Sequence, residues 1–267
     1  MTVQERLRKT AWRLGRKLYL WARKDLINDP DTNGEYWLLK ELIQTRHEGQ
    51  VFLDVGANKG DWSARALALS QQKAMRIKIH CFEPTSVTRT LLTSRYAAVD
   101  SITVHATALS SATGQEKFYS GSDYAGTNSL SPISGERVEL VEVSTIDHFM
   151  QAFEIKKIAM LKIDTEGYDF QVLLGAQQAL LSGVIEVVQF EYNWRWLINH
   201  ACLRDVFSLI KNSPYRFGKL VGTRIEFYEA WHFELDRFFE NNYVLIRTDS
   251  AVCDLGDIVY FDSANSL

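Results

Sequence analysis

The sequence of 267 residues lacks cysteine-based metal or redox motifs and any membrane-spanning apolar run. Its three cysteines, Cys81, Cys202 and Cys253, are widely separated and show none of the short paired spacings of metal or redox motifs. No apolar run approaches the roughly 18 residues that a membrane-spanning helix needs. The N-terminus also has no uninterrupted apolar segment followed by a small-residue cleavage site. We therefore expect reduced core thiols and a cytoplasmic protein.

The chain as a whole also lacks an excess of positive charge. Its net charge is -3 at pH 7, whereas nucleic-acid affinity depends mainly on Lys and Arg that neutralise phosphates. We therefore expect no nucleic-acid partner. Hydrophobic residues make up 46% and charged residues 24% of the chain, as in folded globular proteins, and the length suits one α/β domain with extensions.

Positive charge is nevertheless concentrated at the N-terminus. Residues 1–24 contain eight basic residues and one acidic residue, which gives this segment a net charge of +7. A second helix is expected over 34–45, after a turn near 28–31. We define 1–46 as a basic amphipathic helical extension and 47–267 as the main domain. In the first helix, apolar residues recur at steps of four and three, the spacing of one helix face: Leu7, Ala11, Leu14, Leu18 and Trp21.

Three interpretations of the basic helix remain open. It can pack onto the main domain or onto a second subunit, and the latter would make the protein a dimer. It can lie at the surface of an anionic membrane, because interfacial helices combine a basic polar face with Trp and Leu on the other face. It can also hold an acidic substrate such as a phosphorylated glycan.

From residue 51 onward, short apolar runs alternate with segments typical of helices. Runs of this length, bounded by turn residues and separated by helices, are typical of a parallel sheet that is covered on both faces. The sequence therefore predicts a doubly wound α/β fold. The runs lie at 51–55, 77–82, 102–105, 158–163 and 185–192.

One insertion interrupts this alternation. Two β-rich stretches at 116–119 and 138–143 predict a hairpin, and the Gly/Ser/Asn-rich loop between them, 122–134, is a candidate lid. Further strands are expected toward the C-terminus, some of them antiparallel, at 216–221, 224–228, 243–247 and 258–261.

The first two strands of the alternating region are followed by residues suited to a nucleotide-like cofactor. The first runs into the turn DVGANKG at 54–60, whose glycines Gly56 and Gly60 let a ligand approach the backbone closely. The second ends at Glu83, whose carboxylate can accept both hydroxyl protons of a ribose. The structural alternatives are a tight turn without a ligand and a glutamate that only stabilises a helix N-terminus.

The segment KIDTEGYD at 162–169 places acids just past another apolar strand. Carboxyl ends of strands form the ligand crevice of an open α/β sheet, so Asp164 and Glu166 would face the same cavity as the residues above. Asp164 could instead cap a helix. Asp169 lies inside the following helix, where we expect it to face solvent.

The fifth strand is followed by Glu191 and Asn193, again at the carboxyl edge of the sheet. Both are candidates for contact with a substrate or a metal. Ordinary helix capping and packing of the nearby aromatic residues is the structural alternative.

Taken together, these motifs resemble the FkbM family of class I methyltransferases over about residues 50–250. The motifs are DVGANKG at 54–60, FEP at 82–84, ATALSSATG at 106–114, STIDHF at 144–149 and KIDTEGYD at 162–169. The resemblance implies a Rossmann-like, mostly parallel sheet of seven strands with S-adenosylmethionine as cofactor. It also implies methylation of a hydroxyl, commonly on a sugar or a polyketide-like natural product.

The resemblance also implies roles for individual residues. Glu83 would hold the ribose, Thr107 and Ala108 would lie near the adenine, and Asp164 and Glu166 would form the floor of the reaction site. This sequence departs from the family pattern at Lys59, where an apolar residue is common, and at Thr107, where Asn is usual. The methionine portion of the cofactor would be surrounded by Asp54, Gly56, Asn58 and Gly60.

Methyl transfer to a hydroxyl requires alignment of two reactants and is helped by a base that takes the hydroxyl proton. Asp164 or Glu166 is the candidate base, because clustered carboxylates raise one another's proton affinity. Oxygen-rich clusters can also hold Mg²⁺. The candidate metal set is Asp164, Glu191 and Asn193.

Three other functions compete with O-methyl transfer. An NAD-dependent oxidoreductase could use the same turn and Glu83, but the chain has G-x-x-x-G where a dinucleotide fingerprint has G-x-G-x-x-G. A non-catalytic binding protein of methyltransferase fold, recruited through the basic helix, is disfavoured by the intact acids at three strand ends. A methyltransferase acting on nitrogen or protein commonly carries Asn/Asp-Pro-Pro-Tyr/Phe, where this chain has IDTEG.

Overall fold

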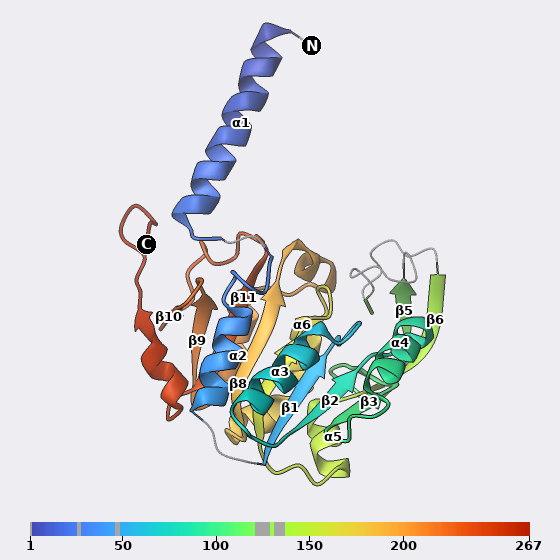
Figure 1. The fold of residues 1–267 in the computed structure, drawn as a ribbon. Coiled ribbons are helices and arrows are strands. Elements are labelled where there is room, and N and C mark those ends of the chain that lie inside the picture. Colours follow the sequence, from blue (N-terminus) through green and yellow to red (C-terminus); the bar gives the residue numbers. More distant parts are fainter. Residues whose placement is uncertain (1, 26–27, 46–48, 121–128, 131–136) are drawn as a thin grey trace.

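The computed structural model describes residues 2–25, 28–45, 49–120, 129–130 and 137–267. Its centre is a nine-stranded sheet in the order β12-β10-β9-β11-β8-β7-β1-β2-β3 (Figure 1). Five neighbouring strands are parallel and carry the site described below: β3 (Ile102–His105), β2 (Ile77–Phe82), β1 (Gln50–Val55), β7 (Ile158–Ile163) and β8 (Ile185–Tyr192). The α/β class and the mostly parallel sheet are confirmed.

The expected number of strands, seven, is wrong. Beyond β8 the sheet continues antiparallel through β11 (Asn241–Arg247) and β9 (Tyr215–Leu220), which completes seven strands. The short strands β10 (Ile225–Tyr228) and β12 (Gly256–Ile258) then lengthen this edge. β10 folds back on β9 as a hairpin, and β12 can lie against β10 because Gly256 has no side chain. A Cβ atom there would lie 2.6 Å from the Ile225 carbonyl oxygen.

Helices cover both faces of the sheet because alternate residues of each buried strand point to opposite sides. Phe52 packs in a buried cluster with α2 (Glu35–Gln44) and α3 (Asp61–Gln72), whereas the adjacent Leu53 packs in the cluster on the other face. That second face is covered by α5 (Ile146–Ala152), α6 (Asp169–Leu174), α7 (Gln177–Leu181), α8 (Leu203–Ile210) and the 3-10 helix η1 (Trp194–Asn199). Two further helices of the main domain are α4 (Ser86–Tyr96) and η2 (Ala251–Leu255).

The predicted hairpin is present as part of a second, three-stranded sheet. β5 (Gly114–Ser120) pairs antiparallel with β6 (Arg137–Ser144), and the short strand β4 (Ala108–Leu109) pairs parallel with β6. Of the candidate lid at 122–134, only Ser129 and Leu130 are described; the rest of that hypothesis lies outside the described residues.

The basic N-terminal segment forms α1 (Val3–Ala22), which projects away from the rest of the molecule (Figure 1). None of its residues is buried. Among the described residues, α1 contacts the main domain through its last turns, where the Tyr19 and Phe239 ring centroids lie 5.8 Å apart. The apolar stripe of the helix stays exposed.

Among the described helices, none combines the length and the apolar character needed to cross a bilayer.

Candidate active site

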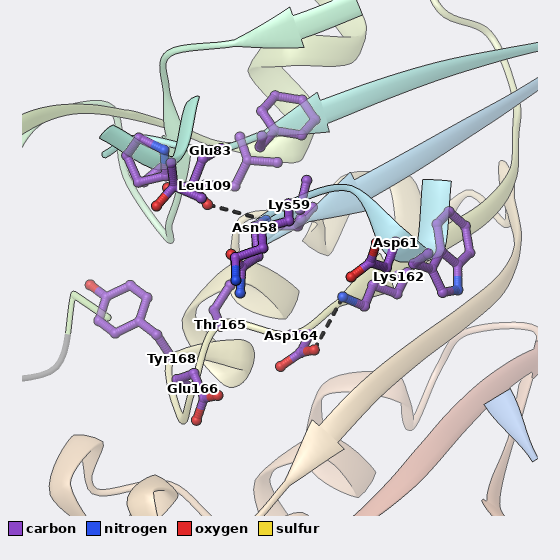
Figure 2. Close-up of a pocket in the computed structure, with 18 of the residues that line it drawn as sticks. Asn58, Lys59, Asp61, Glu83, Leu109, Lys162, Asp164, Thr165, Glu166 and Tyr168 are labelled. Atoms are coloured by element: carbon purple, nitrogen blue, oxygen red, sulfur yellow. Dashed lines mark hydrogen bonds and ion pairs between the residues drawn. The ribbon is translucent and has the colours of Figure 1, made fainter. Parts of the chain in front are cut away.

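A cavity of about 390 Å³ opens at the carboxyl ends of β1, β2 and β7 (Figure 2). Its size falls within the range of about 300–1,000 Å³ that is usual for small-molecule pockets. The charged groups in its wall are predominantly acidic: Glu35, Asp61, Glu83, Asp164 and Glu166, against Lys59 and Lys162. The cavity therefore suits a ligand that carries positive charge.

The turn after β1 is shaped by residues in the left-handed region. Gly56 has a φ of 77° and lies so close to the β7 end that an added Cβ would be 1.9 Å from the Asp164 carbonyl oxygen. Only glycine fits there. Asn58, with a φ of 47°, lines the cavity, whereas Gly60 is the N-cap residue of α3 beside the Tyr96 ring and is not part of the cavity wall.

Glu83 lies beside this turn at the end of β2. The backbone amide of Asn58 donates to Glu83 Oε2 at 3.2 Å (Figure 2), and the Thr85 amide donates to Glu83 Oε1 at 3.0 Å. Burial raises the pKa of this carboxyl, while the hydrogen bonds from Thr85 and Asn58 oppose the rise. The predicted meeting of the glycine turn and Glu83 therefore occurs.

Asp54 comes to the same region, but its side chain has no exposed surface and is not part of the cavity wall. Ser63 Oγ donates to Asp54 Oδ2 at 2.6 Å, and Lys162 Nζ lies 3.6 Å from Asp54 Oδ1. Asp54 therefore forms a buried ion pair with Lys162 behind the cavity wall.

Lys162 is a further residue of the site that was not predicted from the sequence. Its ammonium group lies 3.1 Å from Asp164 Oδ2, and its side chain is only 7% exposed (Figure 2). Burial disfavours the charge of Lys162, but the carboxylates of Asp164, Asp54 and Glu35 outweigh this and raise its pKa. A lysine within the otherwise apolar run 158–163 was the sequence signal that could have identified it.

Two further residues come from the extension before the main domain. Glu35, at the start of α2, lines the cavity, and burial together with Asp164 and Asp54 raises its pKa to about 7, against the lowering effect of Lys162. Asn28 also lines the cavity and donates from Nδ2 to Glu191 Oε1 at 2.9 Å. Neither was predicted, because their place depends on how residues 28–45 fold over the sheet.

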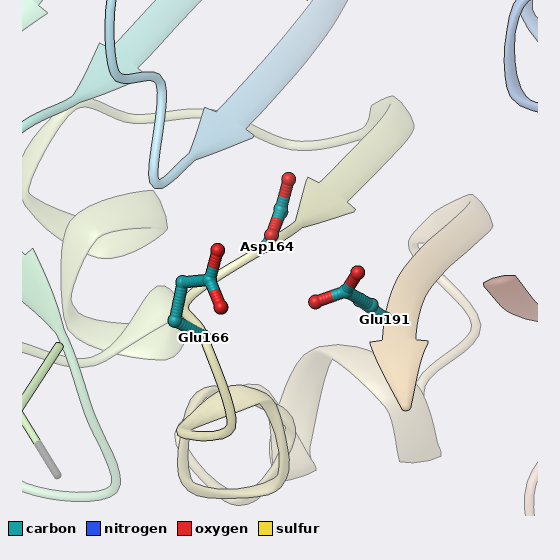
Figure 3. Close-up of side chains that lie close together, drawn as sticks. All are labelled: Asp164, Glu166 and Glu191. Atoms are coloured by element: carbon teal, nitrogen blue, oxygen red, sulfur yellow. The ribbon is translucent and has the colours of Figure 1, made fainter. Parts of the chain in front are cut away.

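Three carboxylates meet at the ends of β7 and β8. Asp164, Glu166 and Glu191 each have an oxygen within 4.8 Å of the others (Figure 3). Burial and then Asp164 raise the pKa of Glu166 to about 8, although Arg195 Nη1 lies 2.6 Å from its Oε2. Burial and the neighbouring carboxylates, Asp164 first among them, also raise the pKa of Glu191.

Asn193 belongs to the support of this cluster. Its Nδ2 donates to Glu191 Oε2 at 3.0 Å, and its Oδ1 accepts from the backbone amide of Arg195 at the start of η1. Its oxygen is therefore used for capping. Of the candidate metal set named from the sequence, Asp164 and Glu191 lie in the carboxylate cluster, and the third carboxylate of that cluster is Glu166.

Asp169 is buried, and the expectation that it faces solvent is wrong. It opens the short helix α6, and its Oδ2 accepts from Gly167 N at 3.2 Å and Thr165 Oγ1 at 3.1 Å. The loop it holds is the one that carries Asp164 and Glu166. Burial, with a contribution from Asp164, raises its pKa to about 7.

Only one of the two residues expected near an adenine lines the cavity. Ala108 lines the cavity, whereas Thr107 is not part of its wall. The part of the wall around Ala108 is apolar or aromatic, and it is formed by Phe82, Leu109, Phe118, Leu130 and Tyr168.

A family model described as the methyltransferase FkbM domain matches residues 54–218, well over half of the chain. The chain belongs to the FkbM methyltransferase family. The match begins at Asp54 and contains the glycine turn and the three clustered carboxylates. Asn28 and Glu35 precede it, so they are additions to the pocket from outside the region that matches the FkbM model.

This FkbM chain is 27% identical over 171 residues to a curated relative, the hexuronic acid methyltransferase AglP of Haloferax volcanii. The alignment covers 64% of the chain and 65% of the relative. The chain therefore spans somewhat less than two thirds of that relative's length.

Two solved structures show weak likeness to this FkbM chain. A SAM-dependent methyltransferase from Agrobacterium tumefaciens has a TM-score of 0.44 and 9% identity, covering 83% of this chain and 63% of the other. A TehB-like SAM-dependent methyltransferase from Corynebacterium glutamicum has a TM-score of 0.39 and 10% identity, covering 88% and 96%. Likenesses at this level do not bear on the substrate.

Proposed function

We propose that this protein transfers a methyl group from S-adenosylmethionine to a hydroxyl of a sugar-containing acceptor. The observation that carries the proposal is the FkbM match over a cavity where a glycine turn, Glu83 and an acidic cluster meet. A sugar is favoured over a polyketide-like acceptor because the curated relative is named as a hexuronic acid methyltransferase.

The residues of the cavity suit this cofactor. Glu83 lines the cavity, and its carboxylate can accept ribose hydroxyl protons beside the bond that Oε2 accepts from Asn58. The apolar wall around Ala108 suits an adenine ring, and the acidic wall near Asp164 suits a positively charged sulfur. When bound, S-adenosylmethionine supplies the methyl group on such a sulfur.

The acceptor hydroxyl needs a base within hydrogen-bond reach. We assign this role to Glu166, because its pKa of about 8 allows it to take a proton near neutral pH. Asp164 is bound to Lys162 and helps to set the charge around the reacting oxygen. Arg195, bonded to Glu166 Oε2, positions that carboxylate.

Incubation with methyl-labelled S-adenosylmethionine and a panel of nucleotide sugars, lipid-linked glycans and macrolides tests the proposal. Label on a sugar hydroxyl supports it, and label on a macrolide would replace the acceptor class. Calorimetry separates the other functions: heat on adding S-adenosylhomocysteine and none on adding NAD is expected. Cofactor binding without transfer to any acceptor would favour a non-catalytic binding protein.

Glu83→Gln is expected to weaken S-adenosylhomocysteine binding by about 10- to 100-fold, because hydrogen bonds to a charged group contribute about 1.5–3 kcal/mol. Calorimetry measures the dissociation constant. Glu142→Gln, on the exposed side of β6, is the matched control and should bind as the unaltered protein does. Undiminished affinity in the folded Glu83→Gln protein would reject the ribose role.

Chelators are expected to leave turnover unchanged. Two of the three clustered carboxylates already face a cation, because Lys162 pairs with Asp164 and Arg195 pairs with Glu166. Turnover is measured with EDTA and after addition of Mg²⁺. Loss of activity in EDTA that Mg²⁺ restores would instead show that turnover needs a metal, for which Asp164, Glu166 and Glu191 are the candidate ligands.

A further inference from the structure

Within the part of the chain that the structure describes, no segment covers the apolar stripe of α1. Its large side chains are between 57% and 80% exposed, namely Leu7, Leu14, Leu18, Trp21 and Val3. At about 100° per residue they fall within a sector of about 60°, which lies inside the sector of about 100° that an ordinary amphipathic helix buries. A helix with this pattern normally packs its apolar face against another surface.

The main domain holds α1 by a different side. The Arg16 guanidinium lies 5.1 Å from the Phe239 ring, Tyr19 Oη donates to Glu234 Oε2 at 2.6 Å, and Arg23 Nη1 donates to the Glu234 carbonyl at 2.8 Å. These residues lie roughly 150° around the helix from the centre of the stripe. The attachment therefore fixes α1 while leaving the stripe turned away from the domain.

Charge indicates what covers the stripe. Most of the circumference outside the stripe is basic, with eight basic residues and one acidic residue in 1–24, whereas the rest of the chain is acidic overall. Stripe-to-stripe pairing of two such helices would bring two segments of +7 together, which opposes a dimer through α1. An anionic bilayer interface matches both sides of the helix. Its acyl chains suit the apolar stripe, and its anionic headgroups suit the basic side.

We propose that α1 binds the interface of an anionic lipid bilayer, with Leu7, Leu14 and Trp21 among the acyl chains and the basic residues at the headgroups. The helix is tied to the domain where it ends: Lys24 Nζ lies 2.5 Å from Glu226 Oε1 and Lys219 Nζ donates to the Arg23 carbonyl. A few residues later Asn28 lines the active-site cavity. Bilayer binding by α1 thus keeps the methyl-transfer site near the membrane surface.

Flotation of the full-length protein with vesicles tests the proposal without any assay of methyl transfer. Binding is expected to vesicles of phosphatidylcholine mixed with phosphatidylglycerol, and it should weaken in high salt and be much weaker with phosphatidylcholine alone. Leu7→Asn combined with Leu14→Asn leaves the charge unchanged and removes two apolar side chains that the bilayer would bury. The affinity for anionic vesicles should therefore fall about tenfold or more.

Trp12→Asn is the matched control, because Trp12 is 71% exposed but lies outside the stripe. It should retain most of the binding. The proposal is overturned if the protein does not float with anionic vesicles, or if Trp12→Asn is as damaging as the double variant. It is also overturned if sedimentation shows a dimer that the double variant dissociates, because the stripe would then be covered by a second copy.

Discussion

Glu166→Gln is expected to lower kcat by about 100- to 10,000-fold, which is the usual contribution of a positioned general base. Glutamine keeps the shape of the side chain but cannot take the acceptor's proton. Asp164→Asn should have a smaller effect, because the Asp164 carboxylate is bound to Lys162 and influences the proton transfer through charge. The measurement is single-turnover methyl transfer at saturating cofactor, with the acceptor that the substrate panel identifies.

The pH dependence of turnover provides an independent test of the same role. Burial and Asp164 raise the pKa of Glu166 to about 8, so the competent carboxylate form increases as pH rises toward this value. Turnover is therefore expected to rise with pH and to level off above about 8. Glu166→Gln should abolish this rise.

A matched control separates catalysis from folding. Glu154→Gln changes an exposed glutamate just after α5 and should leave turnover unchanged. Glu166→Gln should still bind S-adenosylhomocysteine, because the glycine turn and Glu83 are untouched. Normal turnover in Glu166→Gln, with the pH dependence retained, would remove Glu166 as the base.

The residues that could be predicted from the sequence are those fixed by strand ends. An apolar run followed by a polar residue predicts a strand and places that polar residue at the carboxyl edge of the sheet. The sequence therefore predicts that Glu83, Asp164 and Glu166 lie at one edge of the sheet. The roles of these residues stay predictions. The two extra edge strands could not be counted, because β10 and β12 are short and depend on pairing with strands already in place.

Residues whose position depends on long-range packing were missed or misjudged. Asn28 and Glu35 reach the cavity because buried residues of α2, such as Leu38 and Leu42, pack on the sheet, and no local pattern reports that contact. Asp169 was misjudged because helix periodicity says little about a helix as short as α6. There its carboxylate turns back to the preceding loop.

Lys162→Met is expected to reduce the free energy of unfolding by about 3–5 kcal/mol, the usual cost of removing one partner from a buried ion pair. The Asp54 side chain is fully buried, and Lys162 is the cation that faces it at 3.6 Å. Methionine matches the length of the lysine stem but leaves the Asp54 carboxylate without a countercharge. Urea denaturation measures the loss, and Lys157→Met, at an exposed site just before β7, should change stability little.

The pH dependence of this loss follows from Asp54. Burial already raises the Asp54 pKa against the lowering effect of Lys162, so removing the lysine raises it further. The folded variant then binds more protons than its unfolded chain, and its stability falls as pH rises. The deficit should therefore be smaller in acid than at neutral pH, and Asp54→Asn combined with Lys162→Met should recover part of it. A deficit that is independent of pH and unaffected by Asp54→Asn would show that Lys162 stabilises the protein by packing alone.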